Sequence, residues 1–130
     1  ENEFNTLLDF IKQIRFDHIG AFEFSFEPGT TSEPLGDPIP PAVKKERLQR
    51  LMELQQGISL SINQGFVGRD MLVLVEGCND GISVGRTYRD APEIDGLALI
   101  EGLAPVGEIV TARITGAMVH DLTGHLIPNP

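Results

Sequence analysis

The stretch FVGRDMLVLVEGCNDGISVGRTY, residues 66–88, decides the fold of this chain. From Phe66 onward the sequence changes to a period of two residues, which is the period of a β-strand with one buried face. Asn79-Asp80-Gly81 separates two apolar runs, and these residue types favour the tight turn of a hairpin. The stretch therefore predicts two antiparallel strands, Met71–Glu76 and Ile82–Tyr88.

Three further strands are predicted downstream of this hairpin. Gly96–Glu101 is the third and Glu108–Thr115 the fourth. Thr123-Gly124 divides the fifth into Met118–Leu122 and Leu126–Ile127. Five short strands within about 60 residues, with glycine at nearly every corner, are typical of a small closed barrel of the OB-like kind. The expected fold class is mainly β.

A helix and a strand are predicted before the barrel. Phe4–Phe16 has apolar residues at helical spacing, and His18–Glu27 alternates strictly from Phe22 onward. Helix followed by strand is the αβ step of a parallel sheet or a (β/α) barrel. In such a barrel Glu23 and Ser25 would face the lumen and Glu27 its mouth, where ligands bind. A half-exposed antiparallel strand with solvated glutamates is the alternative.

The segment between this strand and the barrel contains a linker and a long helix. Proline and glycine punctuate 32–41, and an apolar stripe follows from Ala42 to about Asn63. We therefore expect three parts: a helix-and-strand segment at 1–36, a linker with a long helix at 37–65, and the β-barrel at 66–130. The chain starts without an initiator methionine, and we expect it to be a segment of a longer protein.

Charge and cysteine content restrict the function classes. The net charge is −9, and residues 66–130 contribute −5 because nine acids outweigh four arginines. Such a surface repels polyphosphate and attracts a basic protein. One cysteine, Cys78, excludes an internal disulfide or a multi-cysteine metal site within the chain. With no apolar run long enough for a membrane span, the cytoplasm is the expected compartment.

The loop GRTYRDAPEIDG, residues 85–96, is the candidate binding site. It places three acids close to two arginines and the only tyrosine, which is typical of an exposed loop that contacts a partner. The candidate contact residues are Asp90, Glu93, Asp95, Arg86, Tyr88 and Arg89. A solvated loop with local salt bridges is the alternative. No catalytic nucleophile is predicted, and His120-Asp121 with His125 lacks the further ligand that a metal site needs.

Four motifs resemble one known family, the radical-SAM methylthiotransferases. FEFSFEPGT (22–30) is similar to a late strand of the family's catalytic barrel, although Phe24 stands where tyrosine is common. PPAVKKERLQRLMELQQGIS (40–59) is similar to the helix that leaves that barrel, and the chain from Gly68 resembles a TRAM domain. DAPEIDG (90–96) is characteristic of the branch that modifies a ribosomal protein. His120 stands where the family often has tyrosine.

The resemblance implies a parent enzyme with two [4Fe–4S] clusters and S-adenosylmethionine. Such an enzyme adds a methylthio group to the β-carbon of an aspartate in a small-subunit ribosomal protein. The cluster cysteines would lie outside this chain, which we expect to be non-catalytic and to hold neither cofactor nor metal.

By the same resemblance, residues 1–36 would be the C-terminal remnant of the catalytic barrel, with Glu23, Ser25 and Glu27 near S-adenosylmethionine. The remainder of the enzyme would be a partner in cis. The alternative is an RNA-binding TRAM domain of a tRNA methylthiotransferase. The acidic charge favours the basic protein substrate over RNA.

Overall fold

The computed structural model of the chain describes residues 1–90 and 96–128. Two compact units are present, Glu1–Gln56 and Gly57–Pro130, and each is described by itself. No helix in the described ranges has the length and apolar character that crossing a membrane requires.

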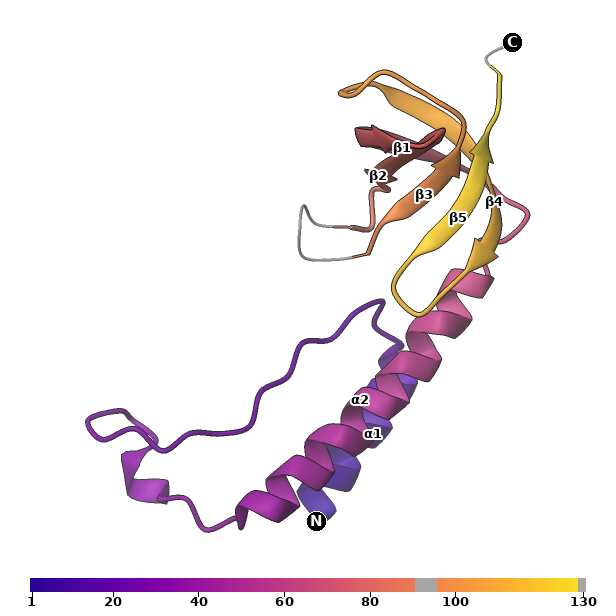
Figure 1. The fold of residues 1–130 in the computed structure, drawn as a ribbon. Helices are drawn as coiled ribbons and strands as arrows, with labels where there is room; N and C mark the ends of the chain where they lie inside the picture. The colour runs from indigo at the N-terminus through magenta and orange to yellow at the C-terminus, as the bar shows by residue number, and fades with distance from the viewer. Residues whose placement is uncertain (91–95, 129–130) are drawn as a thin grey trace. The chain divides into compact units, whose positions relative to one another are not determined.

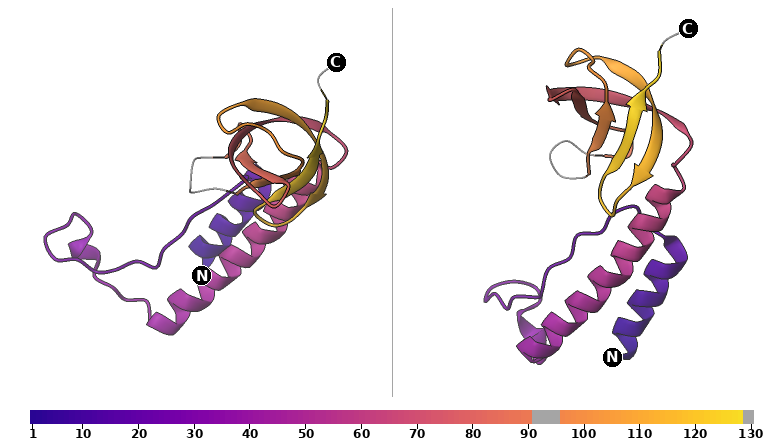
Figure 2. Two further views of the ribbon diagram at one scale, coloured as in Figure 1. Left: turned by 45° about the horizontal axis from the view of Figure 1, so that its top comes forward. Right: turned by 45° about the vertical axis from the view of Figure 1, so that its right-hand side comes forward.

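The first unit contains one whole helix and the larger part of a second, which continues into the second unit. α1 (Asn2–Ile14) confirms the predicted first helix, with both ends two residues earlier, and it ends where Arg15 adopts a left-handed conformation. α2 (Pro41–Gln64) confirms the predicted long helix. α1 and the first part of α2 lie side by side (Figures 1 and 2), and Ile11 of α1 and Leu51 of α2 are buried.

Charged contacts hold the two helices together at one end. The carboxylate of Glu1 accepts hydrogen bonds from Arg47 at 3.1 Å and Arg50 at 3.2 Å. The same two guanidinium groups lie over the ring of Phe4, so that their positive charge meets the negative face of the aromatic ring. At the other end, Gln55 donates to the carbonyl oxygen of Phe16 at 2.7 Å.

The predicted strand His18–Glu27 is wrong, because this segment is irregular in the structure. A strand needs a neighbour for its backbone N–H and C=O groups, and no described residue pairs with this segment. Phe22 is 95% exposed, whereas Lys44 of α2 donates to the carbonyl oxygen of Phe24 at 3.0 Å and covers its ring. A short 3₁₀ helix, η1 (Glu33–Leu35), follows in the proline-rich linker.

The second unit is a closed five-stranded barrel with the strand order β1-β2-β3-β5-β4 (Figure 1). This confirms the predicted mainly β, OB-like fold. The strands are β1 (Asp70–Asn79), β2 (Ile82–Arg86), β3 (Ala98–Glu101), β4 (Ile109–Ala117) and β5 (Leu122–Leu126).

β1 is shared between two neighbours, and it changes partner at Leu74. Its first half, from Asp70 to Leu74, pairs with β4. Its second half, from Leu74 to Asn79, pairs with β2 through a β-bulge between Val75 and Gly77. β3 and β5 form the one parallel pair among the described strands and complete the ring.

The barrel interior is filled by alternate residues of the strands. Among the described residues, two clusters of the core are one around Val73, Ile100 and Ala112 and one around Met71, Ile114 and Leu122. Four of these residues are fully buried, at 0% exposure: Val73, Ile100, Ala112 and Ile114. Burial of a branched aliphatic side chain stabilises a fold by about 1.5–3 kcal/mol, so Val73, Ile100 and Ile114 each contribute to the stability of the barrel.

The division predicted for the fifth strand is wrong. Thr123-Gly124 lies in the middle of β5, whereas residues 118–121 form the preceding loop. Gly124 pairs with Ile114 of β4, and a Cβ atom there would lie 2.2 Å from the carbonyl oxygen of Arg113. Glycine is therefore present because two backbones approach closely, and not because the chain turns.

We predict that Gly124→Ala destabilises the barrel. The added methyl group would collide with the backbone of β4 at Arg113, which cannot move without disturbing the pairing between β4 and β5. The expected loss in the free energy of unfolding is about 1–3 kcal/mol, measured by urea denaturation. Gly77→Ala is the control, since a Cβ at Gly77 has open space within 4 Å. Equal stability of the two variants would contradict the close approach of the backbones at Gly124 and Arg113.

Candidate binding site

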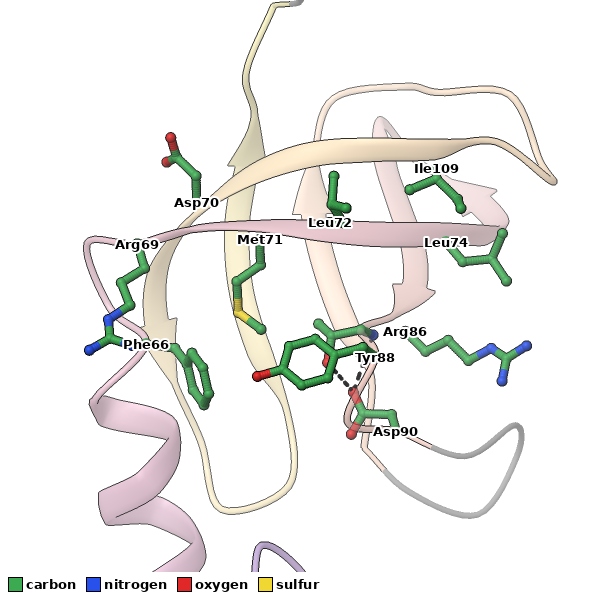
Figure 3. Close-up of a pocket in the computed structure, with 11 residues that line it drawn as sticks. Phe66, Arg69, Asp70, Met71, Leu72, Leu74, Arg86, Tyr88, Asp90 and Ile109 are labelled. Carbon is green, nitrogen blue, oxygen red and sulfur yellow. Dashed lines mark hydrogen bonds between the residues drawn. The ribbon is translucent and has the colours of Figure 1, made fainter.

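An open hollow of about 630 Å³ lies beside the first half of β1 (Figure 3). Its walls come from the segment before β1, from β1 itself, from the end of β2 and the turn after it, and from the start of β4. The lining residues are Phe66, Arg69, Asp70, Met71, Leu72, Leu74, Arg86, Thr87, Tyr88, Asp90 and Ile109.

Exposed apolar side chains dominate this surface. Leu72 is 62% exposed, Ile109 67% and Tyr88 84%. Leu74 lies opposite Ile109 in the β1–β4 ladder and opposite Arg86 in the β1–β2 ladder, so three strands contribute to one row. A contiguous apolar surface rimmed by polar groups is typical of an interaction site.

Two ion pairs lie next to the apolar residues. Arg86 pairs with Glu76 at 3.1 Å, and Arg113 pairs with Asp70. The hydrogen bond from Arg113 lowers the pKa of Asp70, and the same bond raises the pKa of Arg113. Both groups therefore remain charged across the physiological range, so the rim of the hollow keeps fixed charges.

A short turn, Thr87 to Asp90, directs the chain away from β1 at the end of β2. The backbone N–H of Asp90 donates to the carbonyl oxygen of Thr87 at 3.1 Å. The carboxylate of Asp90 accepts from the Thr87 hydroxyl at 3.1 Å, and Thr87 is 4% exposed. Asp90, a predicted contact residue, thus also shapes the turn that carries the loop.

Asn63 in the last turn of α2 connects the two loops next to the site. Its amide nitrogen donates to the carbonyl oxygens of Met118 at 2.8 Å and Val119 at 3.3 Å. Its amide oxygen accepts from Arg89 at 3.1 Å. Since Asn63 is only 2% exposed, these bonds are shielded from water, and losing them leaves buried polar groups unpaired.

Arg89 also stacks on Phe66, with its guanidinium carbon 4.4 Å from the ring centroid. Arg69 lies over the same ring at 5.9 Å. Phe66 is therefore held by two cations at the edge of the hollow, which fixes the segment between α2 and β1.

The far end of the acidic loop is anchored by β-barrel backbone. A Cβ atom at Gly96 would lie 1.4 Å from the carbonyl oxygen of His120, so only glycine fits. Next to it, the backbone N–H of Leu97 donates to the carboxylate of Asp121 at 2.9 Å. Asp121 therefore has a structural partner in the loop that precedes β5.

The structure brings together part of the predicted site. Arg86, Tyr88 and Asp90 line the hollow, whereas Arg89 binds Asn63 and Phe66. Two further predicted residues, Glu93 and Asp95, lie outside the described residues.

Sequence reasoning missed Leu72, Ile109 and Phe66 as lining residues. The sequence did contain a sign that Leu72 is exposed. The run MLVLV has more apolar residues than the inward face of one strand can bury.

The residues of this chain do not fit an iron–sulfur cluster. The single cysteine, Cys78, has its sulfur 3.1 Å from the carbonyl oxygen of Ala104, whereas such clusters are held by several thiolates. Within the described ranges there is no group of three or more metal-ligating side chains. Glu23, Ser25 and Glu27 lie in the exposed irregular segment of the first unit, where Ser25 approaches Glu27 at 3.5 Å.

Comparison with known proteins places the barrel in a family. Residues 67–127 match the TRAM domain family. The chain is 45% identical to the ribosomal protein uS12 methylthiotransferase RimO of a Roseiflexus species, over 98% of its own length. It is 45% identical to the proteins of the same name from Microcystis aeruginosa, over 98% of the chain, and Thermus thermophilus, over 95%.

The barrel is thus a TRAM domain, the class of small β-barrel that its fold and its matched residues define. Over 95–98% of its length the chain is similar to RimO proteins of the methylthiotransferase family. It spans between 28% and 30% of the length of these relatives.

We predict that Asn63→Ala destabilises the barrel unit by about 1–3 kcal/mol, because two carbonyl groups and Arg89 lose a buried partner. Chemical denaturation followed by circular dichroism measures this change. Gln64→Ala is the matched control, since Gln64 is the next residue in the same turn and is exposed. An unchanged denaturation midpoint for Asn63→Ala would mean that the three hydrogen bonds of Asn63 do not contribute to the stability of the barrel unit.

We also predict that Arg113→Gln raises the pKa of Asp70 towards its ordinary value, because the charged donor is removed. A carboxylate with a lowered pKa in the folded state stabilises the fold above its unfolded pKa, and this stabilisation is lost as the pH falls through the lowered value. Carboxyl-detected NMR titration measures the change. An identical titration of Asp70 in both proteins would disprove the coupling.

Proposed function

We propose that the TRAM barrel is the substrate-docking module of an enzyme that adds a methylthio group to an aspartate of ribosomal protein uS12. The observation that carries the proposal is an apolar hollow in an acidic barrel, with Asp90 among its lining residues. The names of the relatives support the choice of substrate. Docking a basic protein on this surface would position its aspartate for the catalytic part of the enzyme.

Electrostatics supports a protein as the docked molecule. The barrel region has nine acids against four arginines, and no lysine. Ribosomal proteins are basic, so long-range attraction would speed their encounter with this surface. Asp90, Glu93 and Asp95 are the acids that we assign to the contact, with Arg86, Tyr88 and Arg89 beside them.

Catalysis in this proposal belongs to parts of the parent enzyme outside this chain, and the chain alone is inactive. Those parts would supply the cysteines for two [4Fe–4S] clusters and most of the S-adenosylmethionine site. Residues 1–36 would complete the catalytic barrel, with Glu23 and Ser25 facing its lumen and Glu27 at its mouth. Residues 37–65 would link it to the TRAM domain at 66–130. A ribosomal substrate would place this reaction in the cytoplasm.

RNA binding is the second candidate, and one observation favours it. Phe66 and Tyr88 offer aromatic rings on the hollow, and Arg69 and Arg86 line the same surface. OB-like barrels bind single-stranded nucleic acid through stacked bases and a positive groove. The barrel's net charge of −5 opposes this reading, because phosphate binding requires a positive field.

The test is a titration of the chain with purified uS12 and, in parallel, with tRNA, each at two salt concentrations. We predict binding to uS12 that weakens with salt, and weaker binding still for the double variant Glu93→Gln/Asp95→Asn. The control is Glu101→Gln/Glu108→Gln, which removes the same charge from exposed residues elsewhere on the barrel.

Two results would overturn the proposal. Preferential binding to tRNA with a steep salt dependence would support the RNA-binding alternative. Binding of uS12 that both double variants weaken equally would mean that the net charge, and not the acidic loop, attracts the substrate.

A further inference from the structure

β1 has one edge without a partner along its first half. On one side, Asp70 to Leu74 pairs with β4. On the other side, the register with β2 begins only at Leu74, opposite Arg86. Within the described ranges, no strand continues this second ladder towards Asp70.

The peptide groups of Asp70 and Leu72 face this open edge. The carbonyl oxygen of Arg69 accepts from the N–H of Ile114 at 2.9 Å, and the N–H of Val75 donates to the carbonyl oxygen of Glu108 at 2.9 Å, both on the β4 side. Backbone groups alternate sides along a strand, so Met71 and Val73 also face β4. The N–H and C=O groups of Asp70 and Leu72 must then point the other way.

The open edge lies over the hollow already described. β2 would cover it if the strand continued, but the Thr87–Asp90 turn directs the chain elsewhere. In Figure 3, Phe66 and Tyr88 lie on the side of β1 opposite β4, where a further strand would be placed. The hollow of about 630 Å³ is bounded by both rings and by the edge itself.

We propose that this edge binds an extended segment of the substrate protein as an additional β-strand. The inference rests on the proposed function and names the mode of recognition at the same site. Backbone hydrogen bonds to Asp70 and Leu72 would supply affinity, as in other cases of strand addition. Alternate side chains of the segment would meet Leu72 and Leu74 on one face and Tyr88 and Phe66 on the other.

The chemistry of the hollow defines the segment. Leu72 and Ile109 accept an apolar side chain, since they are 62% and 67% exposed. Tyr88 offers an exposed aromatic face to a lysine or arginine. A segment that alternates apolar and basic residues, from a basic protein, therefore matches both faces and the barrel's charge of −5.

Amide hydrogen exchange of the 130-residue chain, with and without saturating uS12, tests the proposal. In the free chain, the amides of Asp70 and Leu72 should exchange faster than those of Met71 and Val73, which are bonded to β4. With uS12 bound, exchange at Asp70 and Leu72 should slow by about tenfold or more. Amides of the β3–β5 pair, distant from the edge, serve as the internal control.

A variant isolates the backbone hydrogen bond. Leu72→Pro removes the outward N–H and spares the β1–β4 ladder, because proline is tolerated at a free strand edge. Leu72→Ala keeps the N–H and controls for the lost side chain. We expect Leu72→Pro to weaken uS12 binding at least about tenfold more than Leu72→Ala. With proline at position 72, an added strand would lose the hydrogen bond to the N–H of residue 72 and would clash with the pyrrolidine ring.

The outcomes separate this inference from the proposed function. If uS12 binds while Asp70 and Leu72 gain no protection, strand addition is overturned and the docking function stands. If uS12 does not bind, both fail. Protection of the same amides by single-stranded RNA and not by uS12 would overturn the protein segment as occupant.

Discussion

The barrel depends on β1, because this strand pairs with two neighbours, β4 and β2. β1 pairs with β4 up to Leu74 and with β2 from Leu74 onward. The two ladders therefore meet at Leu74, which pairs with both neighbours, and this closes the ring of strands. Because the first half of β1 pairs with β4 alone, its other edge has no neighbour among the described strands. Closure of the barrel and exposure of an edge therefore have the same cause, and the hollow lies where that edge is open.

The surroundings of this edge are held in place by polar contacts of few residues. Asp90 and Thr87 form the turn that ends β2, and Asn63 ties that turn, through Arg89, to α2 and to the loop before β5. Gly96 fixes the return of the acidic loop against His120. A docking surface benefits from such support, because a rigid site loses little conformational entropy when a partner binds.

The sequence predicted the barrel and both helices because their signals are local. Alternation at 108–115 and helical spacing at 42–63 depend only on neighbouring residues. The strand expected at 18–27 has the same alternation, yet a strand forms only where another strand pairs with it. Gly124 was misread because a glycine required by close packing looks the same in a sequence as a glycine in a turn.

The candidate site was predictable only in part. The acidic loop and Tyr88 are visible in the sequence as an unusual cluster of charge beside an aromatic residue. Leu72, Ile109 and Phe66 come from three separate segments, and only the fold brings them to one hollow.

We propose that this hollow contacts the substrate protein. The most direct measurement places the photo-crosslinker p-benzoylphenylalanine at Tyr88 and maps its products with uS12 by mass spectrometry. The same probe at Leu103, an exposed residue that does not line the hollow, gives the background. The account predicts crosslinks to one segment of uS12 from position 88 alone. Equal products from both positions would contradict it.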